Sequence, residues 1–350
     1  MSRLTAIAIA AFVFANCASA QTTSTGSGQA ASTGSGQATS TRSGPAASTA
    51  GQAYPTRPIR VIIPYPPGGT SDILARLIGN KLTESWRQQI IVDNRTGASG
   101  NIGAELGARA TPDGYTLVLS DIGNVVISSV LFAKLPFDVL RDFAPVTTVS
   151  YSPHLLMTHV KMPVATTEEL IAYAKARPGK LNFPTGLGGA PHLGGLMFAQ
   201  RAGIDWVYVP TKGGASSVAA ILAGEGDAMF LGMLQSLPHV NGGRLKLIAV
   251  SSEKRLPNLP KVATVSETFP GFVTGSWQGI LAPARTPSEL IAKLNGEVAR
   301  ILKLPDVNEI LVSQGTTPIA NSPQETRQWM ADEKARWTKV VKDSGFKLEQ

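Results

Sequence analysis

The sequence predicts an α/β fold in which parallel strands are covered by helices on both faces. Residues 59–63, IRVII, form a continuous apolar and β-branched run, which is typical of a strand buried on both sides. A glycine-rich turn and an amphipathic helical pattern follow it, and the order strand, loop, helix, strand then recurs. The 350 residues are 43% hydrophobic and 16% charged, which is enough to build two domains with sizeable cores.

The elements of the first part begin after Tyr54 and Pro55. The segment PYPPGG at 64–69 ends the first strand, and the polar residues Thr70-Ser71-Asp72 then offer caps to a helix that extends through Trp86. Apolar residues of that helix recur on one face. The elements expected next are a strand at 90–92, a glycine-rich loop at 94–103, a helix to about 110, a turn at 112–114 and a strand at 115–119.

The middle of the chain repeats this organisation, and the last third is mainly helical. Glycine-rich loops at 184–189 and 210–214 each lead from an expected strand into an expected helix. Ser322 followed by Pro323 is a favourable helix start, because proline suits the first helical position. Expected helices are 166–176, 192–201, 215–223, 287–302 and 322–342, and expected strands are 180–183, 206–209 and 245–250.

The N-terminus has the pattern of a secretory signal. Arg3 is followed by an apolar stretch at 4–14 and by Ala18-Ser19-Ala20, an A-x-A cleavage site. We therefore expect residues 1–20 to be a signal peptide. A second interpretation is a lipid anchor on Cys17, because the residues before it resemble a lipoprotein box, although Asn16 is unusual there.

Residues 21–53 are low in complexity. An eight-residue unit recurs as TSTGSGQA, ASTGSGQA and TSTRSGPA. Such a sequence cannot bury apolar area, so it is expected to be a flexible linker. Cys17 is the only cysteine, so cleavage after residue 20 leaves a chain without disulfides or thiolate metal ligands.

Several functions are disfavoured by the sequence. The net charge is +8, but the basic residues are scattered rather than gathered in a stripe, so no nucleic-acid partner is expected. The four histidines lack metal-binding spacing. GASGN at 97–101 misses the nucleophile elbow G-x-S-x-G by one residue, and Pro191 stands where a dinucleotide fingerprint needs its third glycine. We expect no catalysis, no metal and no cofactor.

Three glycine-rich loops favour a binding function instead. They lie at 66–72, 185–192 and 210–214, each between an expected strand and an expected helix. In parallel α/β sheets such loops meet at the carboxyl ends of the strands, where ligands bind. Glycine lets backbone N–H groups approach a ligand, and the positive helix N-terminus favours an anion. These loops therefore predict a cleft suited to a carboxylate.

A series of ordered motifs runs along the folded part of the chain. These motifs are PTRPIRVIIPYPPGGTSDILAR (55–76), VDNRTGASGNIGA (92–104), TPDGYTL (111–117), LRDFAPV (140–146), TGLGGAPHLGGLMF (185–198), VPTKGGASSVAAILAGEGDAMF (209–230), GRLKLIAVSSEKRLPNLPKVATVSE (243–267) and SWQGILAPARTP (276–287). Together they resemble one family, the solute-binding receptors of tripartite tricarboxylate transporters, also called Bug receptors. The resemblance extends from Tyr54 almost to the C-terminus.

The resemblance implies a two-domain periplasmic-binding-protein fold, the Venus flytrap. Each domain would be a central, mostly parallel sheet flanked by helices, and two crossover strands would join the domains. Domain 1 would comprise residues 54–155 plus 275–350, and domain 2 residues 156–274. The protein would be a periplasmic monomer that captures a dicarboxylate, tricarboxylate, aromatic acid or amino acid. It would deliver this ligand to two membrane subunits of the transporter.

The resemblance also implies a set of ligand-binding residues. Several have a structural alternative: Asp72 as a helix cap, His192 as a structural histidine and Lys212 as a solvated charge. Asp227 is expected to organise a loop. The implied ligand residues are Tyr65, Pro66, Gly68, Gly69, Thr70, Asp72, Gly186, Gly189, His192, Thr211, Lys212 and Gly213.

Two departures from the family pattern affect the expected pocket. Thr211 stands where the family commonly has a tyrosine, and the segment 187–190 lacks a serine that is often present. Two alternative functions stay open. One is an exported hydrolase or isomerase that pairs His192 with Asp72 or Asp227. The other is a ligand-sensing receptor for a membrane signalling protein.

Overall fold

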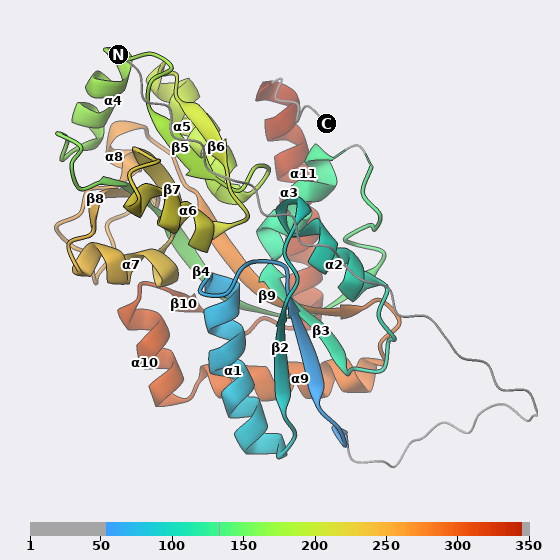
Figure 1. Cartoon of the computed structure of the whole chain (residues 1–350). Coiled ribbons are helices and arrows are strands. Elements are labelled where there is room, and N and C mark those ends of the chain that lie inside the picture. Colours follow the sequence, from blue (N-terminus) through green and yellow to red (C-terminus); the bar gives the residue numbers. More distant parts are fainter. Residues whose placement is uncertain (1–53, 133, 345–350) are drawn as a thin grey trace, which may run out of the picture. The chain divides into compact units, whose positions relative to one another are not determined.

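The computed structural model describes residues 54–132 and 134–344 (Figure 1). These residues belong to one structural unit, Gly51–Gln350. The predicted signal peptide, its alternative lipid-anchor site and the predicted linker lie outside the described residues. None of the helices in the described part of the chain combines the length and apolar character that a membrane span requires.

The first sheet is built around β1 (Ile59–Ile63), which pairs in parallel with β2 (Ile90–Asn94) and β3 (Thr116–Asp121). Successive side chains of β1 point to opposite faces, and both faces are covered. One face packs against α1 (Thr70–Trp86), and the other against α2 (Asn101–Ala108) and α3 (Ile122–Leu131). The apolar run IRVII is therefore a strand buried on both sides, as its sequence predicts.

Two long strands connect the halves of the described chain. The first part of β4 (Phe143–His159) pairs with β9 (Gly275–Pro283), and its last residues pair with β7 (Ala228–Gly232) and β8 (Leu245–Val250). β9 also pairs with β3, and the short β10 (Thr317–Pro318) pairs with β4. β4 therefore runs from one sheet region into the next (Figure 1).

The expectation of mostly parallel sheets is wrong for these connecting strands. Every pairing of β4 and β9 that is described, with each other and with β3, β7, β8 and β10, is antiparallel. The physical reason is that the chain leaves the first region along β4 and returns along β9, so the two neighbouring strands run in opposite directions. Parallel pairing is kept where a helix connects the strands, as in β1–β2, β1–β3 and β5–β6.

The second region contains its own strands, helices and core. β5 (Asn182–Thr185) and β6 (Val207–Pro210) pair in parallel, and α5 (Ala190–Ala202) connects them. Its large apolar cluster draws buried residues from positions 155–272, with Phe183, Phe198 and Phe230 at its centre. The other helices here are α4 (Thr167–Lys175), α6 (Gly214–Leu222), α7 (Met233–Asn241) and α8 (Val265–Thr268).

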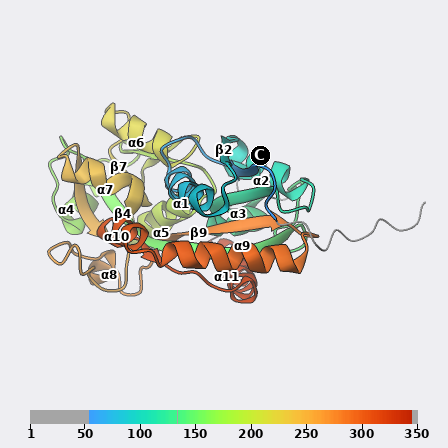
Figure 2. The ribbon, with the colours of Figure 1, turned by 90° about the horizontal axis from the view of Figure 1, so that it is seen from below.

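The C-terminal helices return to the first region. α9 (Ser288–Leu302) packs on the same face of the sheet as α1 (Figure 2). α10 (Pro305–Ser313) follows, and α11 (Pro323–Ser344) packs against α3 and β4. This arrangement of cores and crossing strands is the predicted two-domain α/β fold. The domain limits at residues 155 and 275 stay a prediction.

Candidate ligand-binding site

A cavity of about 660 Å³, counting its solvent-open mouth, lies between the two regions. Loops after β1, β5 and β6 contribute to its lining, together with β9, α7 and the start of α3. The lining residues are Tyr65, Gly69, Thr70, Ser71, Ser99, Asp121, Asn124, Thr185, Gly186, Gly189, Pro191, Thr211, Lys212, Gly213, Gly214, Ser217, Leu231, Gln235, Ser276 and Gln278.

The structure brings most of the predicted ligand residues to this cavity. Those that line it are Tyr65, Gly69, Thr70, Gly186, Gly189, Thr211, Lys212 and Gly213. Four other predicted residues are not part of the lining, namely Pro66, Gly68, Asp72 and His192. Pro66 and Gly68 belong to the same loop as Tyr65 and Gly69.

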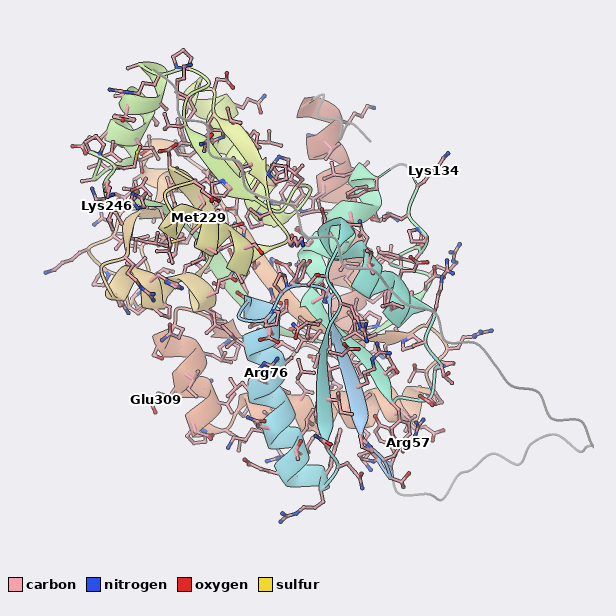
Figure 3. The ribbon with its side chains drawn as sticks, viewed as in Figure 1. Arg57, Arg76, Lys134, Met229, Lys246 and Glu309 are labelled. Carbon is pink, nitrogen blue, oxygen red and sulfur yellow. The ribbon has the colours of Figure 1, made fainter. Side chains whose placement is uncertain are left out.

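Asp72 holds the loop after β1 in place. Its carboxylate accepts the backbone N–H of Gly68 at 2.9 Å and is paired with Arg76, labelled in Figure 3, one turn later in α1. Asn94 donates to the same carboxylate at 3.1 Å. Burial alone would raise the pKa of Asp72, but these hydrogen bonds outweigh it and the pKa is lowered. Asp72 therefore acts as an ionised loop organiser.

His192 and Asp227 also have structural contacts. The Nδ1 of His192 accepts the N–H of Gly188 at 3.1 Å, and burial lowers the pKa of this imidazole to about 4. Asp227 accepts the N–H of Asn182 at 2.7 Å, as expected for a loop organiser. The hydrolase alternative needs Asp72 or Asp227 as the partner of a histidine, and both carboxylates are instead engaged in holding loops.

Three of the helices that begin at the cavity have glycine at the N-cap. These glycines are Gly69 before α1, Gly189 before α5 and Gly213 before α6, and none of them supplies a side-chain cap. The helix N-terminus carries a partial positive charge and unpaired N–H groups. The φ of Gly213 is 138°, and a Cβ there would lie 3.2 Å from Cδ of Pro66, so this close approach requires glycine. The cavity is thus suited to an anion.

Three lining side chains have a buried polar atom with no partner. They are the hydroxyls of Thr70 and Thr185 and the amide oxygen of Gln235. Thr70 is 6% exposed and Thr185 only 1%, so these hydroxyls are shielded from bulk water. Leaving a buried polar group unsatisfied costs about 1–3 kcal/mol. A polar ligand in the cavity would remove this cost.

The lining contains a base and an acid in different environments. Lys212 is exposed at the mouth, whereas Asp121 is buried at the N-cap of α3. Burial raises the pKa of Asp121 to about 6, although hydrogen bonds from Ser276 and from backbone N–H groups act in the opposite direction. A carboxylate in this cavity would therefore be held mainly by dipoles and hydroxyls, since the fixed charges in the lining are few.

A buried polar network lies beside the cavity, where β4 and β9 cross. His154 is fully buried, with Nε2 3.0 Å from the hydroxyl of Ser276 and Nδ1 3.1 Å from that of Thr274. Ser276 lines the cavity, and Ser71 donates to Gln278 at 2.6 Å nearby. The cavity is thus in direct contact with the strands that connect the two regions.

Several lining residues were missed by the sequence analysis. Asp121 is the last residue of β3, Asn124 lies in the first turn of α3, Gln235 comes from α7, and Ser276 and Gln278 come from β9. One signal was present in the sequence. An aspartate just after the apolar run that ends at Leu119, with a further polar residue three positions on, is typical of a helix N-cap at the end of a strand.

The fold and the cavity define a class of protein. Two α/β regions, joined by crossing strands around a cavity lined by helix N-termini, form the architecture of two-domain periplasmic binding proteins. The model of the tripartite tricarboxylate transporter family receptor matches residues 74–346. The chain belongs to this family, and the family is one of solute-binding receptors rather than enzymes.

Similar proteins agree with this assignment over nearly their whole length. Protein BugT of Bordetella pertussis (strain Tohama I) is 36% identical over 303 residues, which cover 86% of this chain and 93% of BugT. An R. palustris protein solved with adipate is 34% identical with a TM-score of 0.81, covering 84% and 99% of the two chains. MatC from Rhodopseudomonas palustris with bound malate is 31% identical with a TM-score of 0.78, covering 82% and 100%.

Proposed function

We propose that this receptor captures a small carboxylate in the cavity and delivers it to the two membrane subunits of a tripartite tricarboxylate-type transporter. The observation that carries the proposal is the meeting of three helix N-termini with glycine N-caps at one cavity that also contains the unpartnered hydroxyls of Thr70 and Thr185.

The electrostatics of the cavity support a carboxylate ligand. Backbone N–H groups and helix dipoles bind anions without an arginine. The hydroxyls of Thr70 and Thr185 add two donors that protein groups do not use. Similar proteins were solved with adipate and with malate, both dicarboxylates. We propose that the ligand is a small carboxylate: a dicarboxylate, a tricarboxylate, an aromatic acid or an amino acid.

The predicted ligand residues divide into those that line the cavity and those that do not. We propose direct contact for the predicted residues that line it and an indirect role for Pro66, Gly68, Asp72 and His192, which hold the lining loops. Thr211, in place of the tyrosine common in the family, leaves room for a ligand of different shape. Its hydroxyl lies 2.8 Å from that of Ser217, so it is already engaged.

We also propose that residues 1–20 direct export to the periplasm and are removed, and that residues 54–155 plus 275–350 and residues 156–274 are the two domains. The mass of the protein purified from its own host tests the first part. Cleavage after Ala20 predicts a chain that starts at Gln21. A chain that starts at an acylated Cys17 would instead establish the lipid anchor.

A thermal-shift screen tests carboxylate binding. Malate, adipate, tricarboxylates, aromatic acids and amino acids are compared with the diamides of malate and adipate, which lack the charge. A ligand at 100 times its Kd adds about 2.7 kcal/mol to the free energy of unfolding. We expect at least one acid to raise the Tm and its diamide to have no effect. An absence of stabilisation by any acid would contradict the proposal.

A matched pair of variants locates the binding site. Thr70→Val and Thr185→Val remove the two buried hydroxyls and keep the side-chain shape, and each is expected to weaken binding by roughly tenfold, as for a hydrogen bond to a charged group. Thr338→Val, on the exposed part of α11, is the control and should bind normally.

Capture of membrane partners by the ligand-bound receptor separates transport from sensing. A transport receptor should capture the two membrane subunits, whereas a sensing receptor would capture a signalling protein instead.

A further inference from the structure

The loop at residues 97–100, within the motif GASGN, has no role in the proposed ligand contacts. Its backbone is unusual, because Gly97, Ala98, Ser99 and Gly100 have φ values of 132°, 45°, 57° and 95°. Non-glycine residues rarely adopt such angles, and segments that do so are held by their surroundings. This conformation places the hydroxyl of Ser99 2.6 Å from the carbonyl oxygen of Leu187, which lies in the loop after β5.

A second side chain crosses the cavity to the same segment. Asn124, in the first turn of α3, accepts the backbone N–H of Ala190 at 2.6 Å through Oδ1. Its Nδ2 donates to the hydroxyl of Tyr65 at 3.3 Å, and its own N–H is held by Asp121. Asn124 is therefore fixed on the β3–α3 side and hydrogen-bonded to the opposite wall.

The contact with Ala190 has the character of a helix cap. Ala190 is the first residue of α5, and the N-cap residue Gly189 has no side chain that could accept its first-turn N–H groups. The Oδ1 of Asn124, on the other wall of the cavity, accepts the N–H of Ala190 instead. Opening the cavity would leave α5 uncapped and would break the Ser99 hydrogen bond as well, because both partners lie within residues 187–190.

We propose that Ser99 and Asn124 form a latch that stabilises the closed cavity and thereby slows the release of ligand. The effect on ligand release rests on the proposed function. The effect on closure does not, since the two hydrogen bonds are present without a ligand. Ser99 and Asn124 are positioning residues, and they act by holding the loop that carries Gly186 and Gly189 against the opposite wall. Each bond shifts the ratio of closed to open receptor by about fivefold, the effect of a typical hydrogen bond.

A distance measurement without ligand tests the latch. Spin labels are placed on Glu84→Cys in α1 and Lys175→Cys in α4, both exposed, with Cys17→Ser to remove the only natural cysteine. Double electron–electron resonance then compares this parent with Ser99→Gly, Asn124→Ala and their combination. We expect each single variant to move population from the shorter to the longer distance, and the double variant to move more. Ser129→Ala, whose hydroxyl bonds within its own helix, is the control.

The Ser99→Gly variant is expected to fold, because glycine tolerates the φ of 57° better than serine does. The release rate of whichever acid binds in the thermal screen gives the second reading. Each single variant should raise this rate by about fivefold and leave the association rate almost unchanged. Identical distance distributions in the parent and the double variant would overturn the latch. A receptor that shows the distance change but binds no acid would contradict the proposed function and leave the latch intact.

Discussion

The buried His154 predicts that the receptor loses stability in acid. The side chain is fully buried where β4 passes from one region to the next, and burial lowers its pKa to about 3 from the ordinary value of 6.5. The native state keeps the imidazole neutral, whereas the unfolded chain takes up a proton below pH 6.5. The stability that His154 contributes is therefore fully present above pH 6.5 and is lost as the pH falls toward 3.

The size of this effect follows from the two pKa values. At pH 5 the unfolded state gains about 2 kcal/mol relative to the native state through His154 alone, and at pH 4 about 3 kcal/mol. His192, with a pKa lowered by burial to about 4, acts in the same direction. Asp121 acts in the opposite direction, because its raised pKa of about 6 favours the folded state at low pH.

Urea unfolding at pH 7.5 and pH 5 measures the contribution of His154. The variant His154→Gln keeps a donor and an acceptor near Thr274 and Ser276 but does not titrate. Between the two pH values the parent should lose about 2 kcal/mol more than this variant. His159→Gln, on the same strand and half-buried, is the control. Equal losses in the parent and His154→Gln would refute the reasoning.

Four further substitutions have expected outcomes. Gly189→Ala places a Cβ 3.3 Å from the amide of Asn124, so it should weaken acid binding severalfold, measured by ligand titration. Gly296→Ala lies in α9 with open space around it, so it should raise the free energy of unfolding in urea by roughly 0.5–1 kcal/mol. Asp72→Asn removes a carboxylate whose pKa is lowered by its hydrogen bonds, so the loss in unfolding free energy should be larger at pH 7 than at pH 3, and equal losses would contradict this role. The ionised carboxylate of Asp121 repels an anion, so the parent should bind the acid more tightly as the pH falls from 7.5 to 6. In Asp121→Asn this rise in affinity, measured by calorimetry, should be smaller.

The local part of the fold could be predicted because its signals are local. The run at 59–63 is continuously apolar, and the glycines of the three loops stand directly between strand and helix patterns. The first strand, the first helix and most of the predicted lining glycines follow from such short-range patterns.

The rest depends on contacts between distant residues. The pairing of β4 with β9 joins residues more than a hundred positions apart, and neither strand has turn signals that reveal its partner. Asn124 and Ser276 reach the cavity only through this pairing and through the packing of α3. Asp72 and His192 follow the expected loops closely in sequence, but their side chains turn back to hold backbone N–H groups, which spacing alone does not reveal.

Native mass spectrometry of the receptor purified from its own host tests the central claim most directly. We predict one small acid bound per chain, released when the protein is unfolded and lost or reduced in the Thr70→Val, Thr185→Val double variant. A receptor that carries no small molecule, and that takes up none of the screened acids when they are added before the measurement, would contradict the claim that this cavity binds a carboxylate.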